Sequence, residues 1–126
     1  MELPPPHRKT RKSFNIPGEA HELTFSCFKR RKFLGKERTC THFLEALDLA
    51  RDKHGIHLWA YVIMPEHAHV LFWPEREEYS VGSILKTIKQ SVARKAIRYL
   101  REKNPAGLKL LATGHKESPY RFWMDG

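Results

Sequence analysis

Hydrophobic and polar positions form regular patterns from about residue 20 onward. Between Glu22 and Lys29 apolar and polar side chains alternate, which is typical of a half-buried strand. Between Lys36 and His54 the apolar side chains recur every three or four residues, as on one face of a helix. Gly55 follows where a left-handed residue would end that helix. These patterns predict a strand followed by a helix.

Two short apolar runs follow this helix. IHLWAYVIM, Ile56 to Met64, is rich in β-branched and aromatic side chains, and HAHVLFW, His67 to Trp73, repeats that character. Only Pro65 and Glu66 separate the two runs. Strand-forming runs joined so closely predict an antiparallel hairpin.

A second helix and a final strand complete the pattern. Ser80 can cap a helix that runs to about Glu102, because residues 104–107 contain Asn, Pro and Gly. Residues 118–123 form a last extended piece. The order strand, helix, hairpin, helix, strand predicts an α+β, ferredoxin-like fold, in which a four-stranded antiparallel sheet carries two helices on one face.

Residues 1–18 differ from the rest of the chain. They contain three consecutive prolines, the basic stretch HRKTRK and a Pro-Gly pair, and they offer little apolar surface to bury. We therefore expect a flexible basic arm at 1–18 and a single domain at 19–126, since 126 residues suffice for one ordinary core.

Charge points to a polyanionic partner. The 23 lysines and arginines outnumber the 14 acidic residues, which gives a formal charge of +9. Nucleic acid is the expected partner. A membrane-surface protein is the weaker alternative, because the basic stretches have no matching long apolar face. With no signal-like segment and two cysteines that need not pair, Cys27 and Cys40, we expect a cytoplasmic protein with free thiols.

The basic residues fall into two clusters that could contact phosphates. One is the connection after the first strand, and the other is one face of the second helix. The candidate nucleic-acid-binding residues are Arg30, Arg31, Lys32, Lys86, Arg94, Arg98 and Arg101. A charged helix face is often merely solvated, so that reading stays open. Trp59, Trp73 and Trp123 could stack on unpaired bases or belong to the core.

Two histidines interrupt the second strand of the hairpin. Because side chains alternate across a strand, His67 and His69 share a face, roughly 7 Å apart at their Cα atoms, while Ala68 and Val70 point to the other. If the helices cover the apolar face, both imidazoles emerge on the open face, where they can converge on one divalent ion. Two polar residues on a solvated sheet are the alternative.

The stretch YVIMPEHAHVLF, Tyr61 to Phe72, resembles the signature of the HUH single-tyrosine transposases of insertion sequences, including the REP-associated tyrosine transposases. In that family a turn and strand of the pattern MP-x-H-x-H supply the metal-binding pair, here His67 and His69. The elements from about Glu19 to Gly126 also occur in the family's order. The resemblance implies a metal-dependent endonuclease that carries out DNA transposition, a form of DNA recombination, on single-stranded or hairpin DNA.

The resemblance also implies the reaction. The histidine pair and a third ligand hold Mg²⁺ or Mn²⁺, a tyrosine hydroxyl attacks the scissile phosphate, and a 5′-phosphotyrosine and a free 3′-hydroxyl result. His67 and His69 are thus the expected catalytic and metal-binding residues. Some members form dimers, so a homodimer is expected by resemblance only.

The nucleophilic tyrosine is not identified in this chain. In the family it lies on a helix beyond the final strand, whereas this sequence stops at RFWMDG, so we expect a domain incomplete at its C-terminus. Tyr61 would share the face of the histidines but on a rigid strand, Tyr79 lies in an acidic turn, and Tyr99 falls on the apolar side of its helix. Tyr120 is the least implausible substitute. A non-catalytic DNA-binding module and an RNA-binding ferredoxin-like domain remain alternatives.

Overall fold

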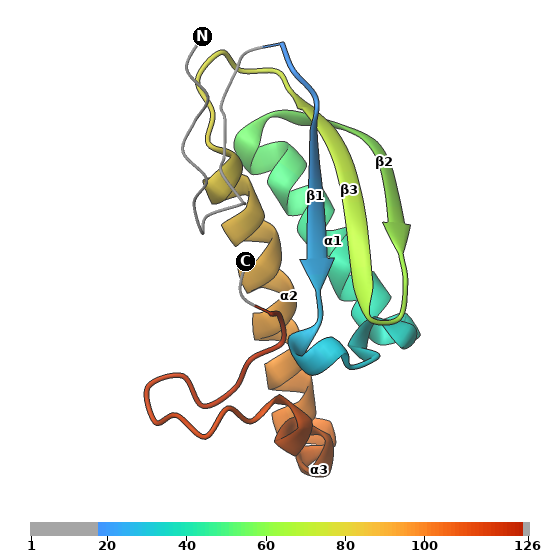
Figure 1. Cartoon of the computed structure of the whole chain (residues 1–126), viewed down its shortest axis with the longest axis vertical. Coiled ribbons are helices and arrows are strands. Elements are labelled where there is room, and N and C mark those ends of the chain that lie inside the picture. Colours follow the sequence, from blue (N-terminus) through green and yellow to red (C-terminus); the bar gives the residue numbers. More distant parts are fainter. Residues whose placement is uncertain (1–17, 125–126) are drawn as a thin grey trace, which may run out of the picture.

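The computed structural model describes residues 18–124, which form a small sheet backed by helices (Figure 1). The strands and helices are β1 (His21–Ser26), α1 (Glu37–His54), β2 (Ile56–Ile63), β3 (His67–Pro74), α2 (Val81–Lys103) and the short α3 (Pro105–Leu108). Single 3₁₀ turns occupy Phe28–Arg30, Phe33–Gly35 and Lys109–Leu111. The predicted strand, helix, hairpin and second helix are confirmed. All but the last residue of the predicted arm lies outside the described residues.

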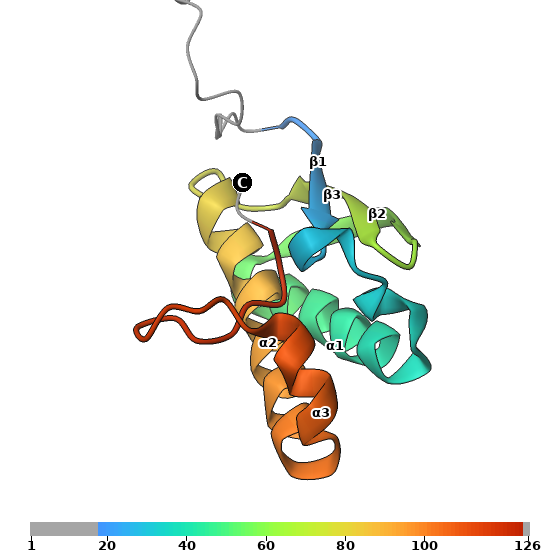
Figure 2. The same ribbon diagram turned by 60° about the horizontal axis from the view of Figure 1, so that its bottom comes forward.

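The sheet has the order β1-β3-β2, and both of its pairings are antiparallel. Figure 2 shows α1 and α2 together on one side of it. Their apolar faces meet the sheet in one core, in which Phe25, Phe72, Phe43 and Ile88 are fully buried. Burial of each such side chain contributes roughly 1.5–3 kcal/mol. No helix of residues 18–124 lies on the other face of the sheet (Figure 2).

The fourth strand that the sequence predicts at residues 118–123 does not form. The sheet of the described residues has three strands, and Trp123 makes only an isolated antiparallel bridge with Cys27, just beyond β1. Phe122 and Trp123 are both buried, at 2% and 6% exposure. Neighbouring residues of a regular strand point to opposite faces, so burying both breaks the alternation that a longer strand requires. The chain thus touches the β1 edge without extending the sheet.

Two predicted helix ends are confirmed in detail. Gly55 adopts the left-handed conformation, with φ 64°, and its N–H donates to the carbonyl of Arg51. Ser80 caps α2, since its hydroxyl accepts a hydrogen bond from the N–H of Ser83 at 3.1 Å. Within residues 18–124 no helix combines the length and apolar character that a membrane span needs.

Candidate functional site

His67 and His69 lie next to each other on the open face of the sheet. Between and beyond them Ala68 and Val70 are fully buried against the helices, so the pleat of β3 turns both imidazoles outward. The two ring centroids are 5.0 Å apart and the ring planes cross at 83°. The open face therefore presents two imidazoles at a single place.

The register between β1 and β3 surrounds these rings with polar side chains. Thr24 lies opposite His69, and its Oγ1 is within hydrogen-bond distance of His69 Nδ1, at 3.1 Å. The carboxylate of Glu22 is 3.8 Å from the same nitrogen, and that of Glu66 is 3.3 Å from Nδ1 of His67 without hydrogen-bond geometry. Both Nδ1 atoms are thus turned toward protein groups. The Nε2 of His69 is left as its free nitrogen.

The separation of the two rings suits a shared divalent cation. A ring bound at about 2.1 Å has its centroid about 3.2 Å from the ion, so two rings bound about 90–110° apart have centroids about 4.5–5.3 Å apart. The observed 5.0 Å lies in that range. No group of three or more His, Cys, Asp and Glu side chains among residues 18–124 is arranged around one point. The described residues therefore fit a metal as two of its ligands.

Sequence reasoning missed Thr24, Glu22 and Glu66 as neighbours of the pair. Alternation within β1 places Glu22 and Thr24 on the polar face, but it does not say which residue of another strand lies opposite. That information comes from the register, which pairs Thr24 with His69 and Ser26 with His67.

The prediction that Tyr61 shares the face of the histidines is also wrong. A bulge between Leu58 and Ala60 shifts the register of β2, after which Tyr61 lies opposite Val70 and Val62 lies opposite His69. Directly opposite residues share a face, so Tyr61 belongs to the helix side of the sheet. The extra residue that the bulge inserts changes which side chains reach the histidines.

The other three tyrosines also lie on the helix side. Tyr79 follows β3 and its hydroxyl is 2.8 Å from Nε2 of His21, while Tyr79 and Tyr120 both pack against the core. The ring of Tyr99 on α2 lies 3.7 Å below the guanidinium of Arg38 on α1. None of the four tyrosines, all within the described residues, therefore stands beside the histidine pair on the open face.

The basic face predicted on the second helix is exposed. Lys86, Arg94, Arg98 and Arg101 are all exposed residues of α2. Arg94 and Arg98 line a groove of about 420 Å³ between α1 and α2, together with Lys53. This groove is on the outer side of the helices, whereas His67 and His69 face away from them. The structure therefore separates these arginines from the imidazoles by the full thickness of the domain.

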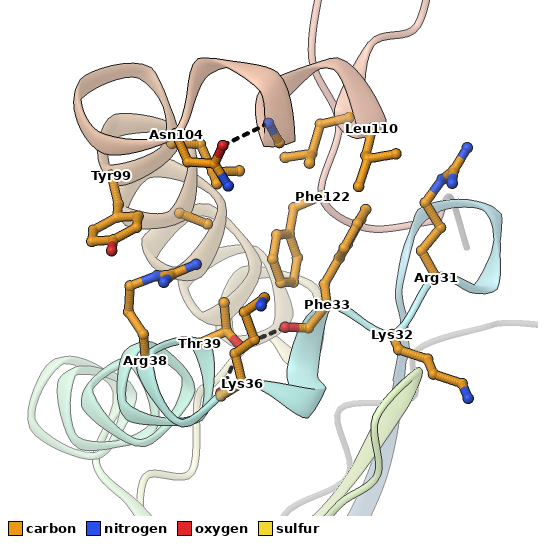
Figure 3. Close-up of a pocket in the computed structure, with 14 residues that line it drawn as sticks. Arg31, Lys32, Phe33, Lys36, Arg38, Thr39, Tyr99, Asn104, Leu110 and Phe122 are labelled. Carbon is orange, nitrogen blue, oxygen red and sulfur yellow. Dashed lines mark hydrogen bonds between the residues drawn. The ribbon is translucent and has the colours of Figure 1, made fainter.

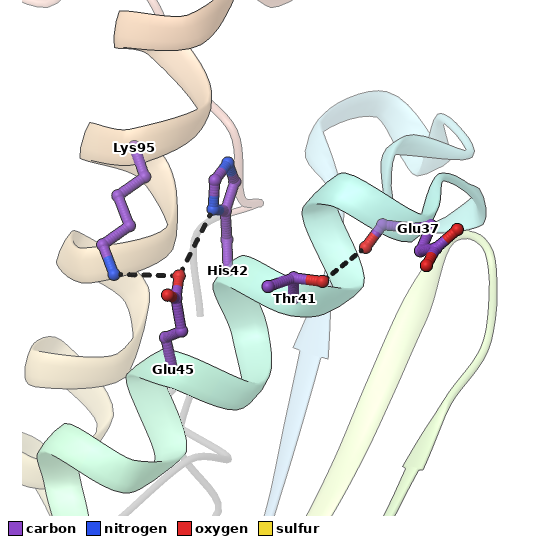
Figure 4. A network of polar contacts seen from close by, with 5 residues as sticks. All are labelled: Glu37, Thr41, His42, Glu45 and Lys95. Atoms are coloured by element: carbon purple, nitrogen blue, oxygen red, sulfur yellow. Dashed lines mark hydrogen bonds and ion pairs between the residues drawn. The ribbon is translucent and has the colours of Figure 1, made fainter.

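One lysine of this groove is already paired. Lys95 Nζ lies 3.1 Å from a carboxylate oxygen of Glu45, and Nδ1 of His42 lies 3.7 Å from the same oxygen (Figure 4). The ammonium of Lys95 lowers the pKa of the Glu45 carboxyl. The positive charge left for a ligand is that of Lys53, Arg94 and Arg98.

The basic connection after β1 lies elsewhere. Arg30 is exposed, and Arg31 and Lys32 line a cavity between the start of α1 and the end of α2 (Figure 3). Of the tryptophans, Trp123 belongs to the core. Trp73 continues the row of His67 and His69 along β3, with its ring centroid 5.5 Å from that of His57.

Comparisons with known proteins agree with this architecture. The family described as "Transposase IS200 like" matches residues 20–115. A solved structure of a REP-associated tyrosine transposase bound to a REP hairpin superposes with a TM-score of 0.64 at 16% identity, over 91% of this chain and 56% of that one. A putative transposase from Deinococcus radiodurans R1 covers 74% of this chain and 71% of its own, at 18% identity and a TM-score of 0.49. No curated protein sequence matches.

The family match and the site coincide. Residues 20–115 include the whole sheet, both long helices and the histidine pair of β3. The chain spans a little over half of the REP-associated transposase that shares its fold. With most of its described residues inside the match, this chain belongs to the IS200-like transposase family.

Proposed function

We propose that residues 19–126 form a DNA transposase domain of the HUH type, which binds single-stranded or hairpin DNA in the cytoplasm and uses His67 and His69 to hold Mg²⁺ or Mn²⁺. The single observation that carries this proposal is the side-by-side placement of the two imidazoles on the uncovered face of the sheet. When bound, the cation would neutralise charge that develops on a phosphate.

The protein's own groups position the substrate. Thr24 fixes the ring of His69 through Nδ1, which leaves Nε2 directed away from β1. Trp73, in the same row of β3, offers an aromatic surface on which an unpaired base can stack. Hairpin DNA is the proposed ligand, since a relative of the same fold was solved with a REP hairpin.

We assign the nucleophile to none of the four tyrosines, because they lie on the helix side of the sheet. That observation favours a second candidate, a DNA-binding module without strand cleavage. Both candidates share the basic groove of Arg94 and Arg98. They differ in whether a strand is cut. A homodimer stays a prediction by resemblance, and an RNA-binding ferredoxin-like domain stays the weaker alternative.

The test combines metal binding and strand cleavage. Calorimetry with Mn²⁺ should give heat that disappears in His67→Ala and His69→Ala, while His57→Ala, an exposed histidine paired with Glu75, keeps it. Manganese-dependent nicking of a hairpin with single-stranded flanks, lost in the same two variants, supports the transposase. Salt-sensitive binding without nicking supports the module, and tighter binding of RNA than of DNA in competition contradicts both.

A further inference from the structure

A cavity with a basic rim lies on the helix side of the molecule, away from the histidine pair. It has a volume of about 540 Å³ and is bounded by the connection before α1, the last turns of α2 and the segment around α3 (Figure 3). Its apolar walls include Phe33, Leu100, Leu110 and Phe122. This volume falls within the roughly 300–1,000 Å³ typical of pockets for small organic ligands.

The charge of the lining has one sign. Four of its side chains are basic and none is acidic. The basic residues are Arg31, Lys32, Lys36 and Arg38. In Figure 3 the head groups of Lys36 and Arg38 reach toward the rings of Phe33 and Phe122, whereas Lys32 points away. An anionic group attached to an apolar or aromatic body would match such a lining.

Two arginines at this cavity each have one guanidinium nitrogen without an acceptor among the described residues. The Nε atoms of Arg31 and Arg38 are buried, and neither has a hydrogen-bond partner. Leaving a buried donor unpaired is unfavourable. Because these Nε atoms are themselves buried, a ligand would contact the outer nitrogens of the guanidinium and not Nε. The guanidinium of Arg38 is held flat over the ring of Tyr99, 3.7 Å from its centroid, which orients it in advance.

A polar group also faces the apolar walls. Asn104 Oδ1 accepts a hydrogen bond from the N–H of Gly107 at 3.1 Å, so its amide nitrogen is the group left to donate. That amide borders the cavity in Figure 3. A nucleobase can accept such a bond at its edge while its face stacks on aromatic rings, whereas an aliphatic anion has no face that can stack.

We propose that this cavity binds one unpaired nucleotide of a DNA strand. The base lies against the ring of Phe33, and its phosphate contacts Arg38 and Lys36. The inference rests on the proposed function only in taking DNA as the partner. It does not depend on the histidine pair, which faces the opposite side of the sheet.

The test compares two probes, a ten-nucleotide oligothymidylate and the same backbone with abasic residues, by fluorescence anisotropy at fixed salt. We expect the oligothymidylate to bind about tenfold more tightly, because stacking of one base contributes about 1–3 kcal/mol. With Trp73 replaced by alanine, so that its ring offers no stacking surface on the open face, Arg38→Gln should remove most of this preference. Arg94→Gln, which takes the same charge from the outer groove, should weaken both probes and keep their ratio.

A second variant keeps the test valid if Arg38→Gln does not fold. Leu110 is 47% exposed, so Leu110→Glu places a negative charge at the mouth of the cavity with little effect on the core. It should also abolish the preference for bases. Equal binding of the two probes by the unaltered protein, or a preference that survives both variants, overturns the proposal.

Thymidine 5′-monophosphate tests whether the cavity binds a free nucleotide or a nucleotide within a DNA strand. If it binds more tightly than the oligothymidylate and loses affinity in Arg38→Gln, the ligand is a free nucleotide and the DNA assignment is wrong. His67→Ala should leave the preference for bases unchanged. Absence of manganese binding and of nicking in the unaltered protein would therefore contradict the proposed transposase without affecting the test of this cavity.

Discussion

The hydroxyl oxygen of Thr24 lies 3.1 Å from Nδ1 of His69, although 45 positions separate the two residues in the sequence. The contact exists because β1 pairs with β3 in a register that places them directly opposite each other. It occupies one nitrogen of the ring and leaves the other for a ligand. Groups in this position commonly fix both the tautomer and the orientation of a metal-binding histidine.

Replacing Thr24 with valine keeps the shape and the β-branch but removes the hydroxyl. If His67 and His69 hold a cation, we expect Thr24→Val to weaken Mn²⁺ binding about 10–100-fold. Titration calorimetry measures this directly. Thr41→Val is the matched control, since the hydroxyl of Thr41 is exposed and donates to the carbonyl of Glu37 within α1, away from the histidines (Figure 4). Equal affinities of Thr24→Val and the unaltered protein would show that the hydroxyl plays no part.

Mutations in the groove of Arg94 and Arg98 should change DNA binding without changing metal binding at the histidine pair. Arg94→Gln combined with Arg98→Gln removes two charges from the helix side, so we expect weaker DNA binding and unchanged manganese binding. The slope of log affinity against log salt should fall by about 1.4 for single-stranded DNA, or about 0.7 for each phosphate that is no longer neutralised. Lys116→Gln, in a loop away from this groove, is the control. A change in the manganese heat would contradict the separation.

Local signals were enough to predict most of the fold. The alternation in β3 placed Ala68 and Val70 inside and His67 and His69 outside, because period-two patterns depend only on the strand itself. Gly55 and Ser80 marked helix ends for an equally local reason. The same alternation predicts, without any tertiary contact, that the two imidazoles lie on one face.

Features that depend on contacts between distant segments could not be predicted in this way. The bulge of β2 places Tyr61 opposite Val70, and no turn or cap residue announces it. The end of the chain reads as a strand, but Phe122 and Trp123 both enter the core. Tertiary packing overrode local preference in both places, and it also decided that Thr24 meets His69.

Replacing Gly55 tests whether the end of α1 requires a left-handed residue. Its φ of 64° is unfavourable for other residues, and a Cβ there would lie 2.9 Å from Nε of Arg76, whose guanidinium donates to the carbonyl of Lys53. We expect Gly55→Ala to lower the free energy of unfolding by about 1–2 kcal/mol in urea titrations. Gly82→Ala, where no atom comes within 3.4 Å, should be neutral or stabilising by up to about 1 kcal/mol. Equal effects would be inconsistent with this reasoning.

The two free cysteines should differ in reactivity. Cys27 is fully buried in the core, and burial raises the pKa of its thiol to about 11. The thiolate is the reactive form, so we expect Cys27 to resist a disulfide reagent at pH 8 in the folded protein. Cys40 is only half-buried and should react first. Mass spectrometry of the labelled peptides identifies which thiol reacts, and early labelling of Cys27 would contradict its burial.

Stability should fall as the solution is acidified. Burial lowers the pKa of His42 and His54 below the ordinary histidine value, and nearby Lys53 and Arg76 lower that of His54 further. The unfolded chain then binds more protons than the folded one below about pH 6.5, so the free energy of unfolding decreases as pH falls through this region.

Urea titrations at pH 7.5 and 5.5 should show this loss for the unaltered protein. His54→Gln can keep a hydrogen bond to Thr87, which lies 2.8 Å from Nε2 of His54, but it cannot take up a proton. The variant should therefore lose less stability between the two pH values. An unchanged difference would mean that His54 is not one of the groups responsible, and greater stability at pH 5.5 would contradict the direction of both shifts.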